Sequence, residues 1–152
     1  MTGQELIALA KQVAQTHQLF PQVVAAICEQ ESGWNPYEVR FEPAWYNRTD
    51  WDSLLKGWTY PRMESQESER VCRSMSWGLM QVLGQTARER GFQDWLPVLA
   101  DPATGLEWGC RTLAFKMSRT EGNISQALEL YNGGANPNYA AEVLARAPKY
   151  LP

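Results

Sequence analysis

Apolar side chains recur every three to four residues along most of the chain, which is the spacing of one face of an α-helix. Stretches with this spacing predict helices at residues 2–18, 21–32, 64–73, 85–90, 102–121, 124–131 and 138–147. No stretch shows convincing alternation with a period of two, and no internal repeat is visible. The pattern therefore predicts an all-α or nearly all-α fold.

Short sequence signals mark the ends of several of these helices. Thr2 and Glu5 have the spacing of a capping box at the start of the first helix. Asp101 and Pro102 suit the N-cap and the first position of a later helix. Such signals place helix boundaries more firmly than periodicity does.

The helical pattern is lost from residue 37 until the polar, helix-like run that ends near residue 75. Aromatic and charged side chains are interleaved in its first part, around Phe41, Trp45 and Arg48. A long irregular segment inside a compact domain is usually functional. We therefore expect residues 37–75 to form a long irregular insert, either part of a site or a surface flap whose aromatic rings pack on the core.

One carboxylate stands where a core residue is expected. Val24, Ile27, Cys28 and Glu31 follow the i, i+3, i+4, i+7 spacing of a single helix face, and the first three are apolar. Partial withdrawal from water disfavours the charged form of a Glu and raises its pKa, as a general acid requires. The alternative is a solvated Glu31 at the edge of the helix.

Length and composition fit one globular domain over residues 1–152. The chain is 44% hydrophobic and 20% charged, and its net charge of −3 gives no reason to expect a nucleic-acid partner. No stretch approaches the roughly 20 apolar residues of a membrane span. The first twenty residues lack a basic start followed by an apolar run, so no signal peptide is expected.

The cysteine and histidine content argues against metal and triad chemistry. Cys28, Cys72 and Cys110 are odd in number and widely spaced, which favours free thiols that pack as small hydrophobic residues. His17 is the single histidine. The sequence therefore predicts no metal site, no cofactor and no Ser-His-Asp triad.

The seven tryptophans are more than a core of this size usually needs, so several are expected to line a surface cleft. Trp95 and Trp108 are expected in the core. The candidates for stacking on a ligand are Trp34, Trp45, Trp51, Trp58 and Trp77.

Four short motifs, in this order, resemble those of the soluble lytic transglycosylase (SLT) domain, a family related to goose-type lysozyme. They are Glu31-Ser32-Gly33-Trp34-Asn35-Pro36, Gly78-Leu79-Met80-Gln81, Asp101-Pro102 and Leu130-Tyr131-Asn132-Gly133-Gly134. The resemblance implies a lysozyme-like helical domain, here with the insert at 37–75. It also implies cleavage of the β-1,4 bond between N-acetylmuramic acid and N-acetylglucosamine in the glycan strands of peptidoglycan.

The resemblance also implies roles for particular residues. The catalytic Glu of the family corresponds to Glu31, and its catalytic-site tyrosine corresponds to Tyr131, placed either to hydrogen-bond Glu31 or to stabilise charge on the reacting sugar. The residues expected to bind substrate are Ser32, Trp34, Glu42, Gly78, Leu79, Met80, Gln81 and Asn132.

The chemical outcome stays open at this point. With Glu31 alone, the product is a 1,6-anhydro-muramic end. With a second carboxylate from the insert the enzyme would be a muramidase that uses water. Of the three acidic residues considered, Asp50 and Asp52 are expected to be surface residues, whereas Glu42 either lies in the cleft or pairs with Arg40 or Arg48. A non-catalytic wall-binding or virion module with the same fold is a third alternative.

The site of action implied by the resemblance is the bacterial cell wall, in the periplasm. Without an export signal, such a domain is expected to be phage-delivered as a lysin or virion component, released through a holin, or exported by a dedicated secretion machine. Virion or secretion-machine components are the partners that this expectation implies.

Overall fold

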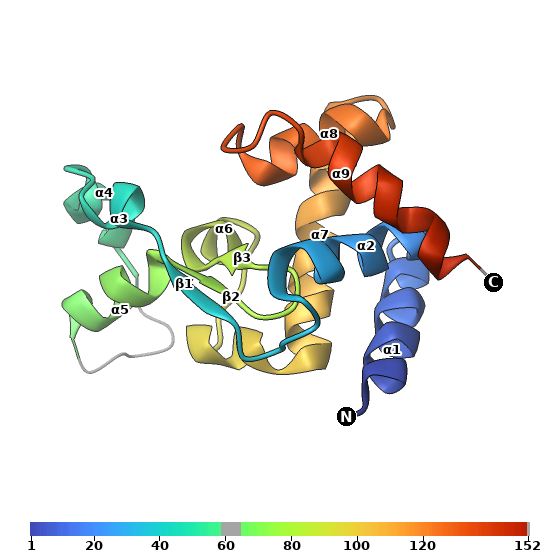
Figure 1. The fold of residues 1–152 in the computed structure, drawn as a ribbon. Coiled ribbons are helices and arrows are strands. Elements are labelled where there is room, and N and C mark those ends of the chain that lie inside the picture. Colours follow the sequence, from blue (N-terminus) through green and yellow to red (C-terminus); the bar gives the residue numbers. More distant parts are fainter. Residues whose placement is uncertain (59–64, 152) are drawn as a thin grey trace.

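Helix α2 (Pro21–Ser32) lies at the centre of the helical part of the molecule. In the computed structural model, which describes residues 1–58 and 65–151, α2 packs against α1 (Gly3–Thr16), α9 (Tyr139–Arg146) and the short turn η2 (Ala147–Tyr150) (Figure 1). Every residue from Val23 to Cys28 is buried. The middle of the helix is therefore enclosed on all sides, whereas the residues at both of its ends are half-buried.

Two further helices complete this core. Helix α7 (Pro102–Arg119) packs on α1, on α8 (Ile124–Asn132) and on the turn η1 (Leu96–Ala100). The helical spacing predicts a core stripe of Leu106, Cys110, Leu113 and Met117, of which the first three are buried and Met117 is partly buried against the core. Asp101 caps its first turn by accepting a hydrogen bond from the Thr104 amide, and Thr2 with Glu5 forms the predicted capping box of α1.

A small antiparallel sheet joins the helical part to the insert. Its strands are β1 (Val39–Phe41), β2 (Met75–Trp77) and β3 (Val82–Leu83), in the order β1-β2-β3, with Arg40 opposite Ser76. The mostly helical prediction is confirmed, and the sheet is the exception to it. Strands of two or three residues are too short to show an alternation of apolar and polar positions.

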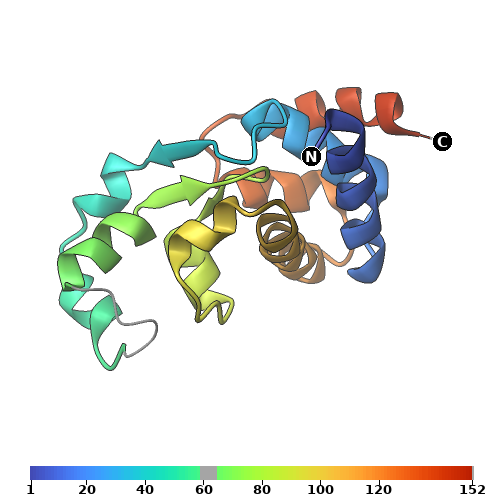
Figure 2. The same ribbon diagram turned by 90° about the horizontal axis from the view of Figure 1, so that it is seen from below.

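The insert is less irregular than its sequence suggests. It contains the short helices α3 (Pro43–Tyr46), α4 (Trp51–Leu55) and α5 (Gln66–Arg73). Seen from below, these helices and the strands form an arm that extends from the helical part (Figure 2). The predicted start of the last of these helices, Glu64, lies outside the described residues.

The cysteines and the helix lengths agree with an ordinary aqueous protein core. Cys28 and Cys110 are buried, as predicted, and all three cysteines are free. Burial raises the pKa of the Cys110 thiol to about 12. Across residues 1–58 and 65–151, none of the helices has both the length and the apolar character needed to span a membrane.

A buried charged cluster fastens the insert to the sheet and to helix α6 (Gly84–Glu89). Glu69 of α5 is fully buried, and its Oε1 accepts hydrogen bonds from Arg73 Nε (2.6 Å) and Arg88 Nε (2.8 Å). Arg88 also donates to the Phe92 and Asp94 carbonyls. One carboxylate therefore serves as the shared counter-charge of two nearly buried guanidinium groups and links α5 to α6.

Replacing Glu69 by Gln should strongly destabilise the fold, because two guanidinium groups would lose their counter-charge inside the protein. We expect a loss of about 3–5 kcal/mol in the free energy of unfolding, measured by urea titration followed by tryptophan fluorescence. Glu67→Gln on the exposed side of the same helix is the control, with an expected loss below about 1 kcal/mol. Equal losses in the two variants would show that the buried cluster does not hold the insert.

Candidate active site

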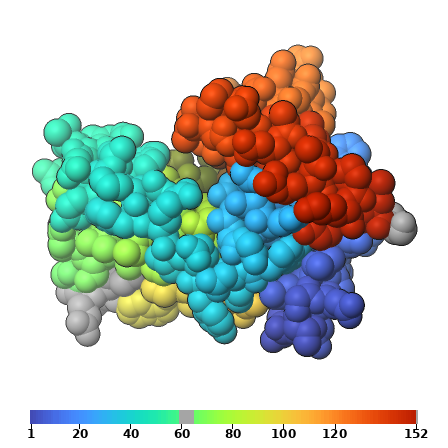
Figure 3. All heavy atoms as spheres, in the orientation of Figure 1, coloured from blue at the N-terminus to red at the C-terminus, as the bar shows by residue number. Residues whose placement is uncertain are grey.

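A groove with a volume of about 500 Å³ separates the insert from the helical part. Its walls come from α3, the β2 and β3 strands, α7, α8 and the loop after α8, and Glu31 lies at its α2 end. In Figure 3 the surface is hollowed between the teal residues of the insert and the orange-red residues near α8. The groove therefore runs across the line where sequence-distant parts of the chain meet.

Glu31 reaches the groove because α2 ends directly after it. Gly33 has a φ of 56° and Trp34 a φ of 69°, so two successive left-handed residues turn the chain away from the helix axis. Glu31 thus belongs to the last turn of a helix whose middle, residues 23–28, is buried. Glycine suits the first of these positions because the left-handed region costs it little.

The carboxyl group of Glu31 is held by a tyrosine from the far end of the chain. Tyr139, the first residue of α9, donates its hydroxyl hydrogen to Glu31 Oε1 at 2.6 Å. Desolvation by burial raises the pKa of Glu31 above its ordinary value, and the Tyr139 hydrogen bond acts in the opposite direction. Burial is the larger effect, so Glu31 holds its proton to a higher pH than an exposed Glu does.

Tyr139 was not among the residues predicted for the site. It is 2% exposed, and burial together with the nearby Glu31 charge raises the pKa of its hydroxyl, which therefore stays a donor. In the sequence, Tyr139 is a single aromatic residue at the start of a predicted packing helix. Nothing local distinguishes it from a core residue, because its partner lies 108 positions earlier.

Tyr131 does not make the hydrogen bond to Glu31 that the sequence suggested as one of its two roles. Its hydroxyl donates to the Met80 carbonyl at 2.8 Å, not to Glu31, although Tyr131 lines the groove. Ser32 donates to the neighbouring Leu79 carbonyl at 2.9 Å. The turn at 78–81 is therefore tied to α2 on one side and to α8 on the other.

That turn places Gln81 at the floor of the groove. Gln81 adopts a φ of 48°, and its side-chain amide donates to the Glu38 and Gly78 carbonyls. Its Oε1 is buried and accepts no hydrogen bond from the described residues. Gly78 also has a positive φ, and any side chain there would collide with the Leu99 carbonyl. The turn thus holds the Gln81 side chain in one orientation beside the groove.

An ion pair from the insert faces Glu31. Glu42 Oε1 accepts hydrogen bonds from Arg40 Nε (2.7 Å) and from Ser76 Oγ (3.0 Å), and all three residues line the groove. The two sequence alternatives for Glu42, a place in the cleft and a pair with Arg40, therefore both hold. The positive charge of Arg40 lowers the pKa of Glu31 and the negative charge of Glu42 raises it, so the two members of the pair act on Glu31 in opposite directions.

The other predicted residues divide between lining the groove and supporting it. Asn132 lines it, and its Oδ1 accepts from the Asn136 amide. Leu79 and Met80 are buried in the core, and Trp34 donates from its indole to the Tyr150 hydroxyl. Ser32, Trp34, Gly78, Leu79 and Met80 are not among the residues that line the groove.

The tryptophan predictions were partly wrong. Trp51 and Trp77 are 5% and 7% exposed, so neither ring is free to stack on a ligand. Trp95, expected in the core, is 46% exposed, whereas Trp108 packs against Phe92 at the edge of the core as expected. Among the five stacking candidates, Trp45 is the one that lines the groove.

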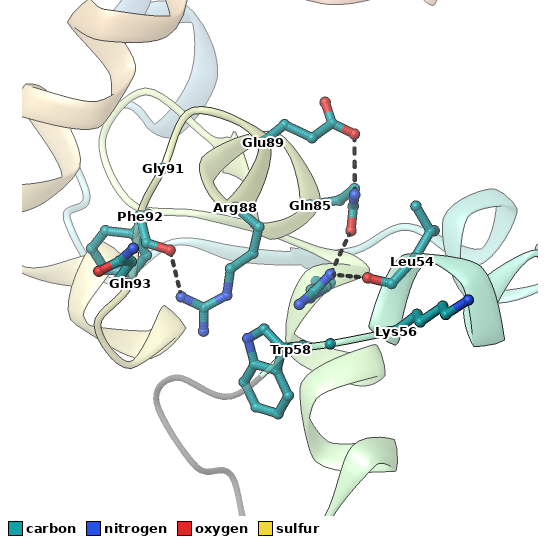
Figure 4. A pocket seen from close by; sticks show the side chains of 11 residues that line it. Leu54, Lys56, Trp58, Gln85, Arg88, Glu89, Gly91, Phe92 and Gln93 are labelled. Carbon is teal, nitrogen blue, oxygen red and sulfur yellow. Dashed lines mark hydrogen bonds between the residues drawn. The ribbon is translucent and has the colours of Figure 1, made fainter.

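A second cavity, of about 420 Å³, lies beside the buried charged cluster (Figure 4). Helix α6 presents Gln85, Arg88 and Glu89 to this cavity and Thr86 to the groove. Glu89 is exposed and accepts a hydrogen bond from Gln85, and Trp58 lies beside the Arg88 guanidinium. Among the described residues that line this cavity, none has a buried carboxyl group comparable with that of Glu31, so the groove is the candidate active site.

Comparison with protein families decides the assignment. The chain matches the family described as "Transglycosylase SLT domain" over residues 8–150, which is nearly its whole length. The chain belongs to this family. Comparisons with curated proteins and with solved structures give no significant match.

Membership of the SLT family has consequences for the groove. The family is enzymatic and cleaves peptidoglycan by transglycosylation, so the non-catalytic module considered from the sequence is set aside. The substrate of this SLT domain is peptidoglycan, and its place of action is the cell wall. Within residues 1–58 and 65–151, no group of three or more His, Cys, Asp or Glu side chains could hold a metal ion.

Removing the Tyr139 hydroxyl should raise the pKa of Glu31 further. In Tyr139→Phe the charged carboxylate loses a donor, whereas the burial that disfavours the charge remains. We expect the Glu31 side-chain carboxyl ¹³C signal to titrate at higher pH than in the wild type. Tyr150→Phe, which removes the analogous hydroxyl from Glu29, is the control and should leave the Glu31 titration in place. A lower Glu31 pKa in Tyr139→Phe would contradict the assignment of this hydrogen bond.

Proposed function

We propose that this SLT domain is a lytic transglycosylase that uses Glu31 as its single acid and base. It would cleave the β-1,4 bond between N-acetylmuramic acid and N-acetylglucosamine and leave a 1,6-anhydro-muramic end. The observation that carries the proposal is the position of Glu31, a carboxyl group whose pKa is raised by burial at one end of a groove in a peptidoglycan-cleaving family.

The hydrogen bond from Tyr139 decides which oxygen carries the proton. Oε1 accepts the Tyr139 hydrogen, so the acid proton of the neutral Glu31 resides on Oε2. In the first step Oε2 gives this proton to the glycosidic oxygen as the bond to the muramic C1 breaks. The sugar then carries positive charge shared between C1 and the ring oxygen.

The second step restores the acid without water. The Glu31 carboxylate takes the proton from the muramic 6-hydroxyl while that oxygen bonds to C1, which closes the anhydro ring. Each proton lost by Glu31 in the first step is thus regained in the second. A positioned acid whose pKa is matched to the working pH contributes roughly 10²–10⁴-fold to the rate.

The remaining groove residues would orient the sugars. Gln81 lines the groove, and its side chain is fixed by the hydrogen bonds that it donates to the Glu38 and Gly78 carbonyls, so it would give the sugars a rigid surface. Tyr131 and Asn132 form the α8 side of the groove. Ser32, Gly78, Leu79 and Met80 would act indirectly by holding the turn that carries Gln81, and Trp34 by its bond to Tyr150.

A muramidase mechanism is the second candidate because Glu42 lines the same groove. A hydrolase would need a free carboxylate to activate water opposite Glu31. One oxygen of Glu42 already accepts hydrogen bonds from Arg40 and Ser76, which favours the ion-pair role over that of a base. Asp50 pairs with Arg48 and Asp52 is exposed, and neither lines the groove.

Glu31→Gln should abolish cleavage of isolated peptidoglycan, because the amide cannot donate a proton to the leaving oxygen. We expect a loss of at least about 10²-fold in the rate of glycan release, measured by chromatography of the soluble products. Glu29→Gln is the matched control, since Glu29 lies on the same helix but bonds to Lys149 and Tyr150. Activity in Glu31→Gln close to that of the control would refute Glu31 as the acid.

The variant Glu42→Gln distinguishes transglycosylation by Glu31 alone from hydrolysis that uses Glu42 as the base. If Glu31 acts alone, the variant should keep cleaving and should still produce anhydro ends, detected by the mass of the released muropeptides. The loss of the Glu42 charge removes an influence that raises the pKa of Glu31, so the pH above which activity falls should shift downward. Reducing ends in the wild-type products, together with an inactive Glu42→Gln, would support the muramidase instead.

A further inference from the structure

Lys116 gives the groove a positive charge that has no ion-pair partner in the part of the chain that the structure describes. The lining of the groove includes four residues that can carry a full charge near neutral pH, namely Glu31, Arg40, Glu42 and Lys116. Arg40 and Glu42 form an ion pair. No acidic side chain of the described residues comes within 4.0 Å of the Lys116 ammonium group.

Lys116 is part of the wall that helix α7 contributes to the groove. It lies on α7 one turn after Thr112, so the two side chains share a helix face, and both line the groove. Thr112 is buried, and its hydroxyl donates to the Trp108 carbonyl. Lys116 therefore belongs to a helix that is anchored in the core, whereas Arg40 and Glu42 belong to the insert.

The charge balance of the groove differs in sign from that of the whole chain. When Glu31 holds its proton and Arg40 offsets Glu42, the groove lining carries the single positive charge of Lys116, although the chain as a whole carries −3. A cation kept in a cleft of an acidic protein favours an anionic group of the ligand.

We propose that Lys116 forms a carboxylate-binding subsite of the groove, which contacts the acidic groups carried by the muramic residues of the substrate. The proposal rests on the proposed function, because it takes the occupant of the groove to be a glycan strand. Muramic acid offers a carboxylate in two ways. Where the lactyl group bears a peptide, the free carboxylates lie on that peptide, and where it does not, the lactyl group itself is ionised.

The test is the kinetics of Lys116→Ala on soluble glycan strands that bear stem peptides. The loss of a partly exposed charge-assisted contact should raise KM about threefold to tenfold and leave kcat nearly unchanged. The difference between the variant and the wild type should shrink as salt is added, since salt screens the contact. Arg119→Ala, which removes a cation of the same helix that does not line the groove, should change KM less than twofold.

Strands stripped of peptide by an amidase identify the source of the carboxylate. If Lys116→Ala raises KM on the peptide-bearing strands only, the partner is a peptide carboxylate, and if it raises KM on the stripped strands only, the partner is the lactyl carboxylate, which is free only there. A KM equal to that of the wild type on both substrates would overturn the subsite. A wild type that releases no product would instead refute the proposed function.

A binding measurement keeps the inference testable without turnover. In the Glu31→Gln background, a disaccharide-peptide is titrated calorimetrically into the protein with and without Lys116→Ala. A threefold to tenfold weaker binding in the double variant would support the subsite whatever the fate of the bond. Equal affinities both for this ligand and for a disaccharide with a free lactyl carboxylate, or an equal loss in the Arg119→Ala background, would overturn it.

Discussion

The arrangement depends on placing a carboxyl group in the last turn of a helix whose middle, residues 23–28, is completely buried. The turns of α2 before Glu31 are enclosed by α1, α9 and η2, so the last turn cannot move away from the groove without opening the core. The Tyr139 hydroxyl then fixes one oxygen of the carboxyl group. The position of the Glu31 carboxyl group and its tendency to stay protonated thus both follow from the packing of α2.

The buried helix, its carboxylate and the helix caps could be predicted from the sequence, because each depends on residues that are close together in the chain. The apolar stripe of Val24, Ile27 and Cys28 predicts the buried helix, and it shows that Glu31 occupies a position on the same face where an apolar residue is expected. The caps at Thr2 and Asp101 are confirmed to the residue. The matched motifs find the turn at 78–81 because its chain conformation demands particular residues, among them a glycine at position 78.

What the sequence could not supply are contacts between distant parts of the chain. The bond from Tyr139 to Glu31, the pairing of β1 with β2 and the approach of Lys116 to the groove all depend on tertiary packing. Tryptophans failed as markers for a related reason. Their large rings are used equally well inside the insert, as at Trp51, and on the surface, as at Trp95.

The buried acid also changes how stability depends on proton uptake. Because the folded state binds the Glu31 proton more tightly than the unfolded chain does, its contribution to stability is complete below the unfolded pKa. That contribution is lost as the pH rises through the higher folded pKa. Glu29, whose Lys149 hydrogen bond lowers its pKa, behaves oppositely and loses its contribution as the pH falls through its folded pKa. Two carboxylates, two residues apart on one helix, therefore bias the folding equilibrium in opposite directions along the pH scale.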